Sequence, residues 1–286
     1  MHILVTGSNG QLGSEIKEQS HLYPEYEFHF TDIDDLDISN EKAVNEYIEK
    51  HYIKCVINCA AYTNVDKAES EPELANKINV LAVKYLAKAC TKYNAQIMHI
   101  STDYVFDGKN YRPYRETDFT NPQSVYGKTK LEGEKIIEEF AKTAVIIRTS
   151  WLYSSYGNNF VKTMLKYGKE RDELNVVFDQ IGSPTYAANL ANIALKNIAD
   201  LQWIQGTHIY HYSDEGVCSW YDFAKAIMDL TGTKCKINAI ESSDYPLPAR
   251  RPYYSVLNKE KIKNSINECS IPHWQDALKE CLKKIK

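Results

Sequence analysis

A tyrosine and a lysine stand four residues apart in the segment Tyr126–Lys130, whose sequence is YGKTK. On a helix this spacing places the two side chains on one face, one turn from each other. A tyrosine hydroxyl ordinarily titrates near pH ~10, and a fixed positive charge close to it favours the ionised form. Lys130 is therefore expected to lower the pKa of Tyr126, which would make Tyr126 a usable general acid.

Two hydroxyls and a carboxylate precede this pair by about 25 residues, in the segment Ser101–Phe106 (STDYVF). They follow an apolar run, Gln96–Ile100, that is typical of a buried strand. In open parallel α/β sheets, ligands bind at the carboxyl ends of the strands. The side chains of Ser101, Thr102 and Asp103 are therefore expected at a ligand-binding edge.

Three glycines, Gly7, Gly10 and Gly13, lie in the segment Thr6–Gly13 (TGSNGQLG), directly after the first apolar run and at the start of a helical pattern. In that position glycines permit a tight turn, let backbone amides approach a pyrophosphate, and let the helix pack closely on the strand. The N-terminus of the helix adds positive potential. The loop therefore predicts a dinucleotide cofactor, NADH or NADPH.

Acidic residues follow the second predicted strand, about 20 residues beyond the glycine loop, where a carboxylate can accept hydrogen bonds from the adenosine ribose. Asp32 has the expected spacing, but Asp34, Asp35 and Asp37 crowd the same turn and any of them could serve. A carboxylate there favours NADH without forbidding the 2′-phosphate of NADPH. The small residues of Asn58–Tyr62 (NCAAY) would let a dinucleotide lie against the backbone after the third strand.

Short apolar runs alternate with longer segments of helical period in the first half of the chain, which predicts a parallel sheet covered by crossover helices. This α/β pattern indicates a Rossmann-like, doubly wound fold. The expected strands are Ile3–Thr6, Glu27–Thr31, Cys55–Cys59, Gln96–Ile100 and Ala144–Ile147. The expected helices are Gln11–Gln19, Glu41–His51, Glu73–Tyr93 and Val125–Lys142.

After Trp151 the alternation loosens, which predicts a smaller C-terminal α+β region. Its expected helices are Asn159–Lys169, Ala188–Ile198 and Tyr221–Leu230, and its expected strands are Asn175–Phe178 and Ile209–Tyr212. We therefore divide the chain into a domain of residues 1–150, expected to bind NAD(P), and residues 151–286, expected mainly to bind substrate. A return of residues 174–199 to the first domain is left open.

The composition excludes several classes of protein. The chain has 286 residues, 43% hydrophobic and 25% charged, with a formal net charge of −4, so no overall basic field would gather nucleic acid or anionic lipid. The seven cysteines are scattered without a C-x-x-C pair, which favours reduced thiols and a cytoplasmic protein. No signal peptide and no apolar run near the ~20 residues of a membrane span is expected.

These motifs resemble those of the extended short-chain dehydrogenase/reductases and, within that superfamily, the dTDP-4-dehydrorhamnose reductases. The glycine loop and the Tyr-x-x-x-Lys pair indicate only the superfamily, whereas the longer motifs indicate the subfamily. The resemblance covers nearly the whole chain, and beyond those two motifs it lies in Asn58–Glu69 (NCAAYTNVDKAE), Ser101–Gly108 (STDYVFDG), Arg148–Tyr153 (RTSWLY), Asp179–Thr185 (DQIGSPT) and Arg251–Leu257 (RPYYSVL).

The resemblance implies reduction of the C4 keto group of a deoxysugar nucleotide. Thr102 would bind the carbonyl oxygen, Tyr126 would protonate it, and Lys130 would bind the nicotinamide ribose. Together these three form the implied catalytic group. Implied cofactor contacts come from Gly7, Gly10, Gln11, Leu12, Gly13, Asp37, Ile38, Ala60, Ala61 and Tyr62, beside Tyr126 and Lys130, with Asp32 as the alternative from spacing. Implied substrate contacts come from Thr102, Asp103 and Trp151.

One departure from the related dehydratases and one requirement of the substrate refine this prediction. Dehydratases of nucleotide sugars carry Thr-Asp-Glu where this chain has Thr102, Asp103 and Tyr104, so the second carboxylate needed for elimination is missing. This favours plain reduction. The diphosphate of the substrate needs a cation, for which Arg250 and Arg251 in the proline-rich segment are candidates, Arg250 being our choice for the binding site.

A metal is not expected. Some relatives are known to dimerise through magnesium held by interface carboxylates, and Glu15 matches one of them, but the others fall on Asn189 and Lys284. Too few oxygen ligands remain for Mg²⁺, so a monomer or a homodimer without a metal interface is expected. The pair His208 and His211 is a weak metal candidate, because residues three apart on a strand face opposite sides.

Two alternatives to the reductase stay open. A regulatory subunit of methionine adenosyltransferase shares this fold and many of these motifs, so a binding protein without turnover is one alternative. Another reductase or an epimerase of nucleotide sugars is the second. The presence of Thr102, Tyr126 and Lys130 counts against the first alternative.

Overall fold

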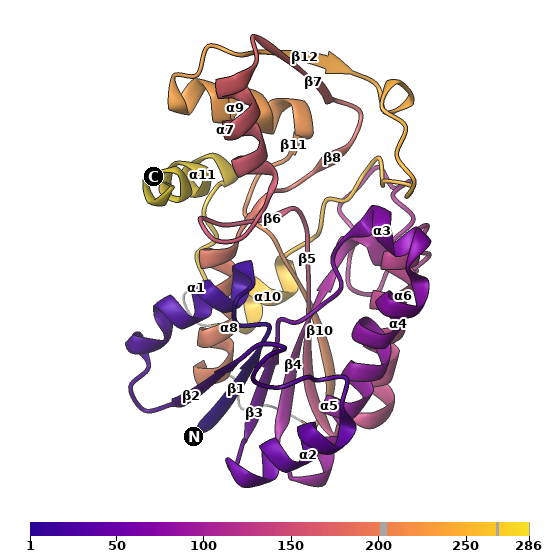
Figure 1. Cartoon of the computed structure of the whole chain (residues 1–286), viewed down its shortest axis with the longest axis vertical. Coiled ribbons are helices and arrows are strands. Elements are labelled where there is room, and N and C mark those ends of the chain that lie inside the picture. Colours follow the sequence, from indigo (N-terminus) through magenta and orange to yellow (C-terminus); the bar gives the residue numbers. More distant parts are fainter. Residues whose placement is uncertain (201–204, 267–268, 286) are drawn as a thin grey trace.

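The centre of the molecule is a six-stranded parallel sheet (Figure 1). The structure is a computed structural model that describes residues 1–200, 205–266 and 269–285. The strand order β10-β5-β4-β3-β1-β2 reverses direction at β1, as in a doubly wound fold. The strands are β1 (His2–Thr6), β2 (Glu27–Thr31), β3 (Cys55–Asn58), β4 (Gln96–Thr102), β5 (Thr143–Thr149) and β10 (Gly206–Tyr212). The predicted α/β class is confirmed.

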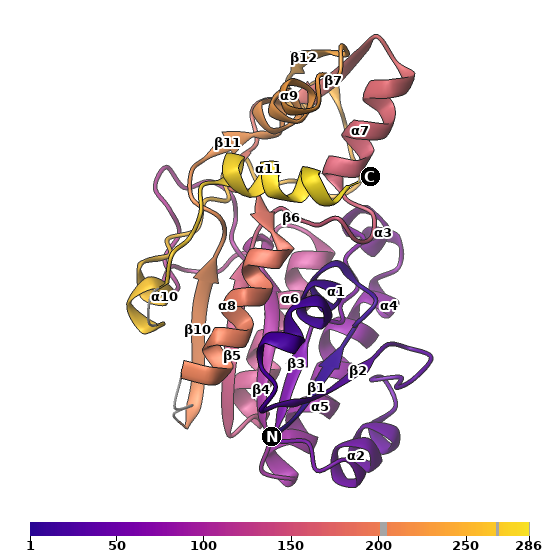
Figure 2. The same cartoon turned by 90° about the vertical axis from the view of Figure 1, so that its left-hand side faces the viewer.

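Helices cover both faces of this sheet, which explains why its strands read as nearly continuous apolar runs. One apolar core joins the sheet to α2 (Glu41–Lys50), α5 (Ala82–Lys92) and α6 (Val125–Phe140). The other joins it to α1 (Gln11–Gln19) and α8 (Ala187–Asp200), which lie side by side on the opposite face (Figure 2). All four residues of β3 are buried between these two layers.

One expected helix is divided. The pattern over 73–93 predicts a continuous helix, but the structure has α4 (Pro72–Asn76), a π-helical turn over Lys77–Leu81 and then α5, with α3 (Val65–Ser70) before them. A π turn inserts an extra residue and often marks a functional position. Here it carries Asn79, whose side chain bonds to the neighbouring loop rather than to its own helix.

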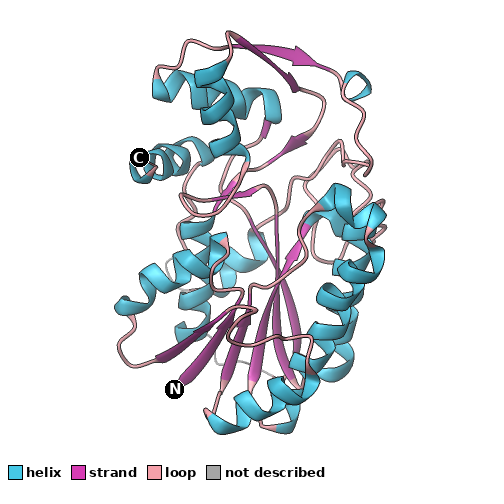
Figure 3. Ribbon diagram, in the orientation of Figure 1, coloured by secondary structure: helices cyan, strands magenta, loops and turns pink. Residues whose placement is uncertain are grey.

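A second region lies beyond the carboxyl ends of the large sheet (Figures 1 and 3). Its helices α7 (Phe160–Glu170), α9 (Trp220–Thr231) and α11 (Trp274–Lys284) pack around an aromatic core that contains Tyr153, Phe223 and Trp274. Its strands form three short pairs: β7 (Glu173–Val177) with β12 (Lys236–Ile240), β6 (Leu152–Tyr153) with β9 (Thr185–Tyr186), and β8 (Ile181–Gly182) with β11 (Cys218–Ser219).

The chain crosses between the two regions more than once. Of the range 174–199, β7 pairs with β12 in the second region, whereas α8 packs on α1 and leads into β10. Strand β10 then pairs in parallel with β5, so residues 206–212 belong to the large sheet although they follow residue 150. A helical crossover between parallel strands accounts for this return. The binding roles of the two regions stay predictions.

The remaining elements are short. They are α10 (Glu260–Ser265) and three 3₁₀ turns, Ser20–Leu22, Asp103–Val105 and Ser242–Asp244. Within the described ranges, every helix is too short or too polar to cross a lipid bilayer.

Candidate active site

The carboxyl ends of three adjacent strands bring the predicted residues to one edge of the sheet. In the parallel register, Thr6 of β1 pairs with Asn58 of β3, and Asn58 pairs with His99 of β4. The glycine loop, the segment 60–62 and Thr102 therefore follow neighbouring strands at the same edge, as the sequence predicts. Helix α6 lies across the end of β4 and brings Tyr126 and Lys130 to this edge.

The glycine loop has the close backbone contacts that a dinucleotide site requires. Gly7 has a φ of +65°, and a Cβ there would lie 2.7 Å from the Ala60 backbone nitrogen. A Cβ on Gly13 would lie 2.5 Å from the Gly7 oxygen, so the helix could not pack on the loop. Gly10 is the N-cap of α1 and offers no side chain, which leaves the first amides of the helix free of a side-chain cap. A pyrophosphate therefore fits this loop.

The residues after Gly10 are divided between the core and the second region. Leu12 is buried in the core beneath α1, so any ligand contact from it must come from its backbone. The Gln11 side chain instead accepts a hydrogen bond from Asn159 Nδ2 at 3.0 Å, across to the loop before α7. The glycine loop is thus tied to both regions of the molecule.

The two predicted adenine-end carboxylates have different partners. Asp32 accepts hydrogen bonds from the backbone of Asn9 and of Ile33, both at 2.9 Å. The bond from Asn9 connects Asp32 to the glycine loop. Asp37 is exposed and accepts bonds from the backbone and the hydroxyl of Ser39, which lower the pKa of its carboxyl. The neighbouring Ile38 is buried. Both carboxylates lie beyond the end of β2.

Asn79 is a residue of this edge that sequence reasoning missed. Its Oδ1 accepts a bond from the Tyr62 nitrogen at 2.9 Å, and its Nδ2 donates to the Tyr62 oxygen at 3.2 Å and to Thr129 Oγ1 at 3.1 Å. It therefore joins the loop of Ala60, Ala61 and Tyr62 to α6. The only signal in the sequence would have been an asparagine in the middle of a helical pattern.

The start of α6 is fixed by caps. Ser124 Oγ accepts a bond from the Gly127 nitrogen at 3.1 Å, and Glu69 Oε1 accepts one from the Val125 nitrogen at 2.8 Å. Gly127 has no side chain because a Cβ there would lie 2.3 Å from the Tyr104 oxygen. The ring of Tyr126 packs edge-on against that of Tyr104, with centroids 5.5 Å apart. The helix thus places Tyr126 beside the end of β4.

The expected effect of Lys130 on Tyr126 is wrong for this arrangement. Burial raises the pKa of Tyr126 to about 12, the Asp103 charge adds to the rise, and only a hydrogen bond with Thr102 lowers it. Lys130 takes no part because its Nζ points to β4, where it donates to the Ile100 oxygen at 2.6 Å and lies 3.3 Å from His99 Nε2. Burial lowers the pKa of Lys130 to about 8, and Glu134 offsets part of this fall.

Thr102 and Asp103 form a buried polar pair next to Tyr126. Thr102 Oγ1 donates to Asp103 Oδ1 at 2.9 Å and accepts from the Tyr104 nitrogen at 3.2 Å. Burial raises the pKa of Asp103 to about 7, an effect that the Thr102 and Ser255 hydroxyls offset in part. Asp103 Oδ2 and Ser255 Oγ are buried without a hydrogen bond of normal geometry to the described residues. This edge therefore retains unused hydrogen-bonding capacity.

A buried ion pair holds α6 against the sheet. Arg148 of β5 donates from Nη2 to Glu134 Oε2 at 2.6 Å and from Nε to Oε1 at 2.9 Å, and Ser101 also donates to Glu134. Both charged side chains are almost fully buried, at 3% and 2% exposed. Sequence reasoning missed Glu134, which lies one turn after Lys130. Removing one partner of such a pair typically costs about 3–5 kcal/mol.

Trp151 lies where the chain enters the second region. Its ring stacks on Trp220 with centroids 3.6 Å apart, and its other neighbour is Gly182, where a Cβ would lie 2.6 Å from the Trp151 ring. The backbone of Trp151 has a φ of +49°, a conformation that costs a bulky residue about 1–3 kcal/mol. The partly exposed ring is thus held firmly at the boundary of the two regions. Trp220 gave no sequence signal.

The two candidate arginines have different surroundings. Arg251 Nη2 donates to Asp66 Oδ2 at 2.8 Å, and the Ala249 nitrogen donates to Asp66 Oδ1 at 3.2 Å, so α3 holds the proline-rich segment. Arg250 is exposed and makes no ion pair or hydrogen bond with any described residue. A role for Arg250 with a diphosphate stays a prediction.

The carboxylate that matches the magnesium interface of some relatives has an ammonium group beside it. Glu15 is buried, accepts a bond from Ser154 Oγ at 2.6 Å and lies 3.7 Å from Lys284 Nζ, which also bonds to Glu18. Asn189, at the second matching position, donates instead to Asp214 at 2.9 Å. The positive charge next to Glu15 is therefore the ammonium of Lys284 in the same chain, not a metal ion.

Two histidine groups lie elsewhere on the large sheet, and the first includes His211 at the carboxyl end of β10, where its ring packs against Phe106. His211 Nδ1 is 3.1 Å from the Tyr114 oxygen and His208 lies three residues before it on β10, as expected for opposite faces. Among the described residues, His2, Glu27 and His29 bring possible ligand atoms together. They lie near the amino ends of β1 and β2, opposite to the candidate site, and the two rings are within hydrogen-bonding distance at 3.1 Å.

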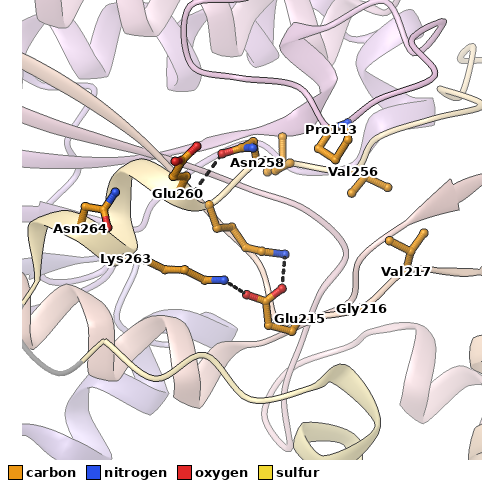
Figure 4. Close-up of a pocket in the computed structure, with 11 residues that line it drawn as sticks. Pro113, Glu215, Gly216, Val217, Val256, Asn258, Glu260, Lys263 and Asn264 are labelled. Atoms are coloured by element: carbon orange, nitrogen blue, oxygen red, sulfur yellow. Dashed lines mark hydrogen bonds and ion pairs between the residues drawn. The ribbon is translucent and has the colours of Figure 1, made fainter.

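A cavity of about 370 Å³ lies beside the segment after β10 (Figure 4). Lys259 and Lys263 line it, and both pair with the Glu215 carboxylate, the first at 3.3 Å. The described residues that line the cavity include none of the predicted site residues. Because its cations are already paired, the cavity is not the candidate active site.

The whole chain, residues 1–286, matches the family model described as RmlD substrate binding domain. The chain is 43% identical to a dTDP-4-dehydrorhamnose reductase of Aggregatibacter actinomycetemcomitans, over 97% of both proteins. It is similar to the crystal structure of a dTDP-4-dehydrorhamnose reductase from Clostridium acetobutylicum, with a TM-score of 0.94 and 46% identity over 99% of both chains. A dTDP-4-dehydrorhamnose reductase from Bacillus anthracis, solved in complex with NADP, gives a TM-score of 0.93 and 38% identity over 99% of both chains.

Proposed function

The chain belongs to the dTDP-4-dehydrorhamnose reductase family, and on that premise we propose that it reduces the C4 keto group of dTDP-4-dehydro-L-rhamnose to give dTDP-L-rhamnose. The reductant is NADPH or NADH. The observation that supports this most is the meeting of Thr102 and Tyr126 at the same sheet edge as the glycine loop. A proton donor and a dinucleotide loop are the two parts that ketone reduction needs.

The dinucleotide would be held by the glycine loop, the free amides at the start of α1 and the backbone of the segment 60–62. Asp32 and Asp37 are the candidates for the adenosine end. When bound, the nicotinamide supplies a hydride to C4 of the sugar. A carboxylate at the end of β2 favours NADH without excluding the 2′-phosphate of NADPH, and Asp37 is exposed there.

Tyr126 donates the proton that the new hydroxyl requires. Because its pKa is raised to about 12, Tyr126 keeps its proton at neutral pH and is ready as the acid. The alkoxide that forms on C4 is a stronger base than a phenolate, so proton transfer from Tyr126 remains favourable. Thr102, whose Oγ1 faces Tyr126, holds the carbonyl oxygen in place for this transfer.

Lys130 supplies the nearby positive charge of the site. Its ammonium, held at β4 rather than against Tyr126, would bind the nicotinamide ribose. Asp103 contacts the sugar nucleotide from the end of β4, and Trp151 contacts it from the second region. Asp103 and Ser255 have free hydrogen-bonding atoms that sugar hydroxyls would satisfy. Arg250 is the candidate for the diphosphate, because its guanidinium has no partner among the described residues.

The assembly and the location of the protein follow from the same proposal. The reaction uses a nucleotide sugar and a nicotinamide dinucleotide, so we place it in the cytoplasm, without a nucleic-acid partner. The chain acts as a monomer or a homodimer that needs no Mg²⁺, because Lys284 neutralises Glu15. Light scattering after size exclusion, with Mg²⁺ and with EDTA, should give the same molar mass.

Turnover decides between the reductase and its alternatives. The purified protein, given dTDP-4-dehydro-L-rhamnose, should oxidise NADPH or NADH and form dTDP-L-rhamnose. Tyr126→Phe should lower kcat by roughly 10²–10⁴-fold while it retains cofactor affinity, because it removes only the transferred proton. Cofactor binding by the wild-type protein without any turnover would instead support a regulatory protein, and full activity of Tyr126→Phe would remove that residue from its role.

A further inference from the structure

A fully buried histidine lies directly under Lys130. His99 is in β4, and its Nε2 is 3.3 Å from Lys130 Nζ. Its other nitrogen, Nδ1, is 3.0 Å from Asn58 Nδ2. Asn58 Oδ1 in turn accepts a hydrogen bond from Thr6 Oγ1 at 2.7 Å. Four side chains thus form one continuous row of hydrogen-bonding groups that ends at the Lys130 ammonium.

The parallel register explains why these side chains meet. Thr6 and Asn58 are cross-strand neighbours, as are Asn58 and His99, so the three side chains lie on one face of the sheet. Helix α6 comes close to this face at Gly133, where a Cβ would lie 2.4 Å from the Asn79 oxygen and 3.7 Å from His99 Nε2. The missing side chain lets Lys130 reach the row.

The His99 imidazole is neutral. Burial first, and then the Lys130 ammonium, hold the pKa of His99 well below its usual value of 6.5. A neutral imidazole has one nitrogen that donates and one that accepts. An imidazolium would direct a second N–H at the ammonium, only 3.3 Å away. The identity of the protonated nitrogen therefore depends on the charge of Lys130.

Two proton arrangements satisfy the row. If Lys130 is an ammonium, His99 Nε2 must accept from it, so Nδ1 carries the proton and donates to the Asn58 oxygen. This arrangement requires the Asn58 amide to turn over from the orientation given above, so that its N–H donates to Thr6. If Lys130 is a neutral amine, Nε2 carries the proton and donates to the amine, while the Asn58 amide keeps the orientation given above and its Nδ2 donates to Nδ1. His99 is neutral in both arrangements.

We propose that His99 is a positioning residue for the reduction, an inference that rests on the proposed function. Its neutral imidazole, fixed by Asn58 and Thr6, accepts a hydrogen bond from the Lys130 ammonium. Together with the Ile100 carbonyl, it fixes the position of the ammonium that would bind the nicotinamide ribose. Neither acceptor is a carboxylate, so the ammonium keeps its full charge for the site.

The proposal has a definite consequence for pH. The groups that face Lys130 are His99 on β4, Cys59 directly after β3, and Glu134 on its own helix, which is paired to Arg148 of β5. Burial already lowers the pKa of Lys130 to about 8. Loss of an acceptor lowers it further, since the ammonium is the form that the acceptor stabilises. Activity then declines at a lower pH on the alkaline side.

The test compares two neutral amides at position 99. The amide of glutamine reaches the place of Nε2, and that of asparagine reaches only the place of Nδ1. We expect His99→Asn to lower kcat roughly 100-fold, as misplacement of a catalytic group by ~1 Å does, and to shift the alkaline limb of its pH profile downward by about one unit. His99→Gln should recover most of the rate and the limb of the wild-type protein.

The control is His211→Asn, because His211 is equally buried but lies two strands away on β10. It should lower stability without moving the alkaline limb. If His99→Asn keeps the wild-type pH profile, or if His99→Gln fails to restore it, the proposal is wrong. The variants are compared after turnover of the wild-type protein has been measured. A failure of this proposal is therefore distinct from a failure of the proposed function.

A second readout uses the wild-type protein and no substrate. In ¹⁵N-histidine NMR spectra, His99 should be neutral and protonated on Nδ1 at pH 6. It should change to the Nε2 tautomer as the pH rises through the pKa of Lys130. A protonated His99 ring at pH 6, or an Nε2 tautomer at that pH, would overturn the proposal even if the variants did not fold. A protein without reductase activity but with this tautomer change would overturn only the proposed function.

Discussion

Two strand ends of the large sheet each carry a buried aspartate and a buried lysine nearby. After β4 they are Asp103 and Lys130, and after β10 they are Asp214 and Lys259. Burial raises the pKa of both aspartates to about 7 and lowers that of both lysines. The residue types and the burial are therefore alike at the two ends, but their partners are not.

At the end of β10 the polar groups are paired. Asp214 accepts bonds from the Tyr186 nitrogen at 2.8 Å and from Asn189 Nδ2 at 2.9 Å. Lys259 lies 3.3 Å from the Glu215 carboxylate and donates to the Asp214 backbone oxygen at 3.2 Å. These bonds join β10 to the segment before α10, so we assign this strand end a structural role.

At the end of β4 the polar groups keep unused capacity. Asp103 Oδ2 has no partner of normal geometry among the described residues, and Lys130 bonds there only to neutral acceptors. Unpaired buried groups cost stability, and they are retained where a ligand or a reaction uses them. Pairing of the polar groups, rather than burial or residue type, therefore separates the candidate site at the end of β4 from the structural cluster at the end of β10.

The largest expected effect comes from removing each lysine in turn. Lys130→Met should lower kcat by at least roughly 10²-fold, since it removes the ammonium that would hold the nicotinamide ribose in place, with little loss of Tm. Lys259→Met should keep kcat within about threefold but lower the free energy of unfolding by about 1–3 kcal/mol, because it leaves Ser213 and Asp214 without their donor. Steady-state kinetics and urea unfolding measure both. Equal effects of the two variants on kcat would contradict the different roles assigned to the two strand ends.

The aspartates should differ in the pH dependence of stability. The folded pKa of Asp103 is above its unfolded value, so its contribution is full below pH ~4 and is lost as the pH rises through about 7. Asp103→Asn should therefore stabilise the protein at pH 8, on the order of 1 kcal/mol, and have little effect near pH 4. Asp214→Asn should destabilise at both pH values, because the new amide turns a donor toward Tyr186 or Asn189. Thermal melts at pH 4 and pH 8 measure both effects. Destabilisation of the protein by Asp103→Asn at pH 8 would contradict this prediction.

A smaller effect is expected at the boundary of the two regions. Trp151→Ala removes the ring stacked on Trp220 and should raise the KM for the sugar nucleotide about five- to tenfold, the size of one lost aromatic contact. The Kd for the dinucleotide should stay the same. Fluorescence titration of the cofactor and kinetics with varied substrate separate the two. A change confined to the Kd for the dinucleotide would instead assign Trp151 to the cofactor site.

The smallest effect is expected at the exposed arginine. Arg250→Ala should raise the KM for the sugar nucleotide about two- to threefold, since an exposed charge pair contributes about 0.2–1 kcal/mol, and should leave Tm unchanged. Arg251→Ala should instead lower Tm, because it breaks the pair with Asp66. If KM responds to Arg251 and not to Arg250, the diphosphate contact belongs to Arg251.

Short-range patterns in the sequence determined much of this protein. The glycine spacing of the first loop, the four-residue spacing of Tyr126 and Lys130, and the alternation of apolar runs with helical segments each follow from local geometry. They were sufficient to predict the parallel sheet and the edge at which the candidate site residues meet. The strand Ile209–Tyr212 was also predicted, but in the second region, and its place beside β5 in the large sheet was not.

Only the tertiary structure decided how these groups are partnered. The direction of the Lys130 side chain depends on His99 and Asn58, which come from neighbouring strands and meet it through the parallel register. Arg251 meets an acid 185 residues earlier in the chain. Spacing along one helix places two side chains on a face, but a pKa and a hydrogen bond depend on every element packed against that face. This is why the sequence led to Tyr126 and Lys130 yet predicted the wrong direction for the pKa of Tyr126.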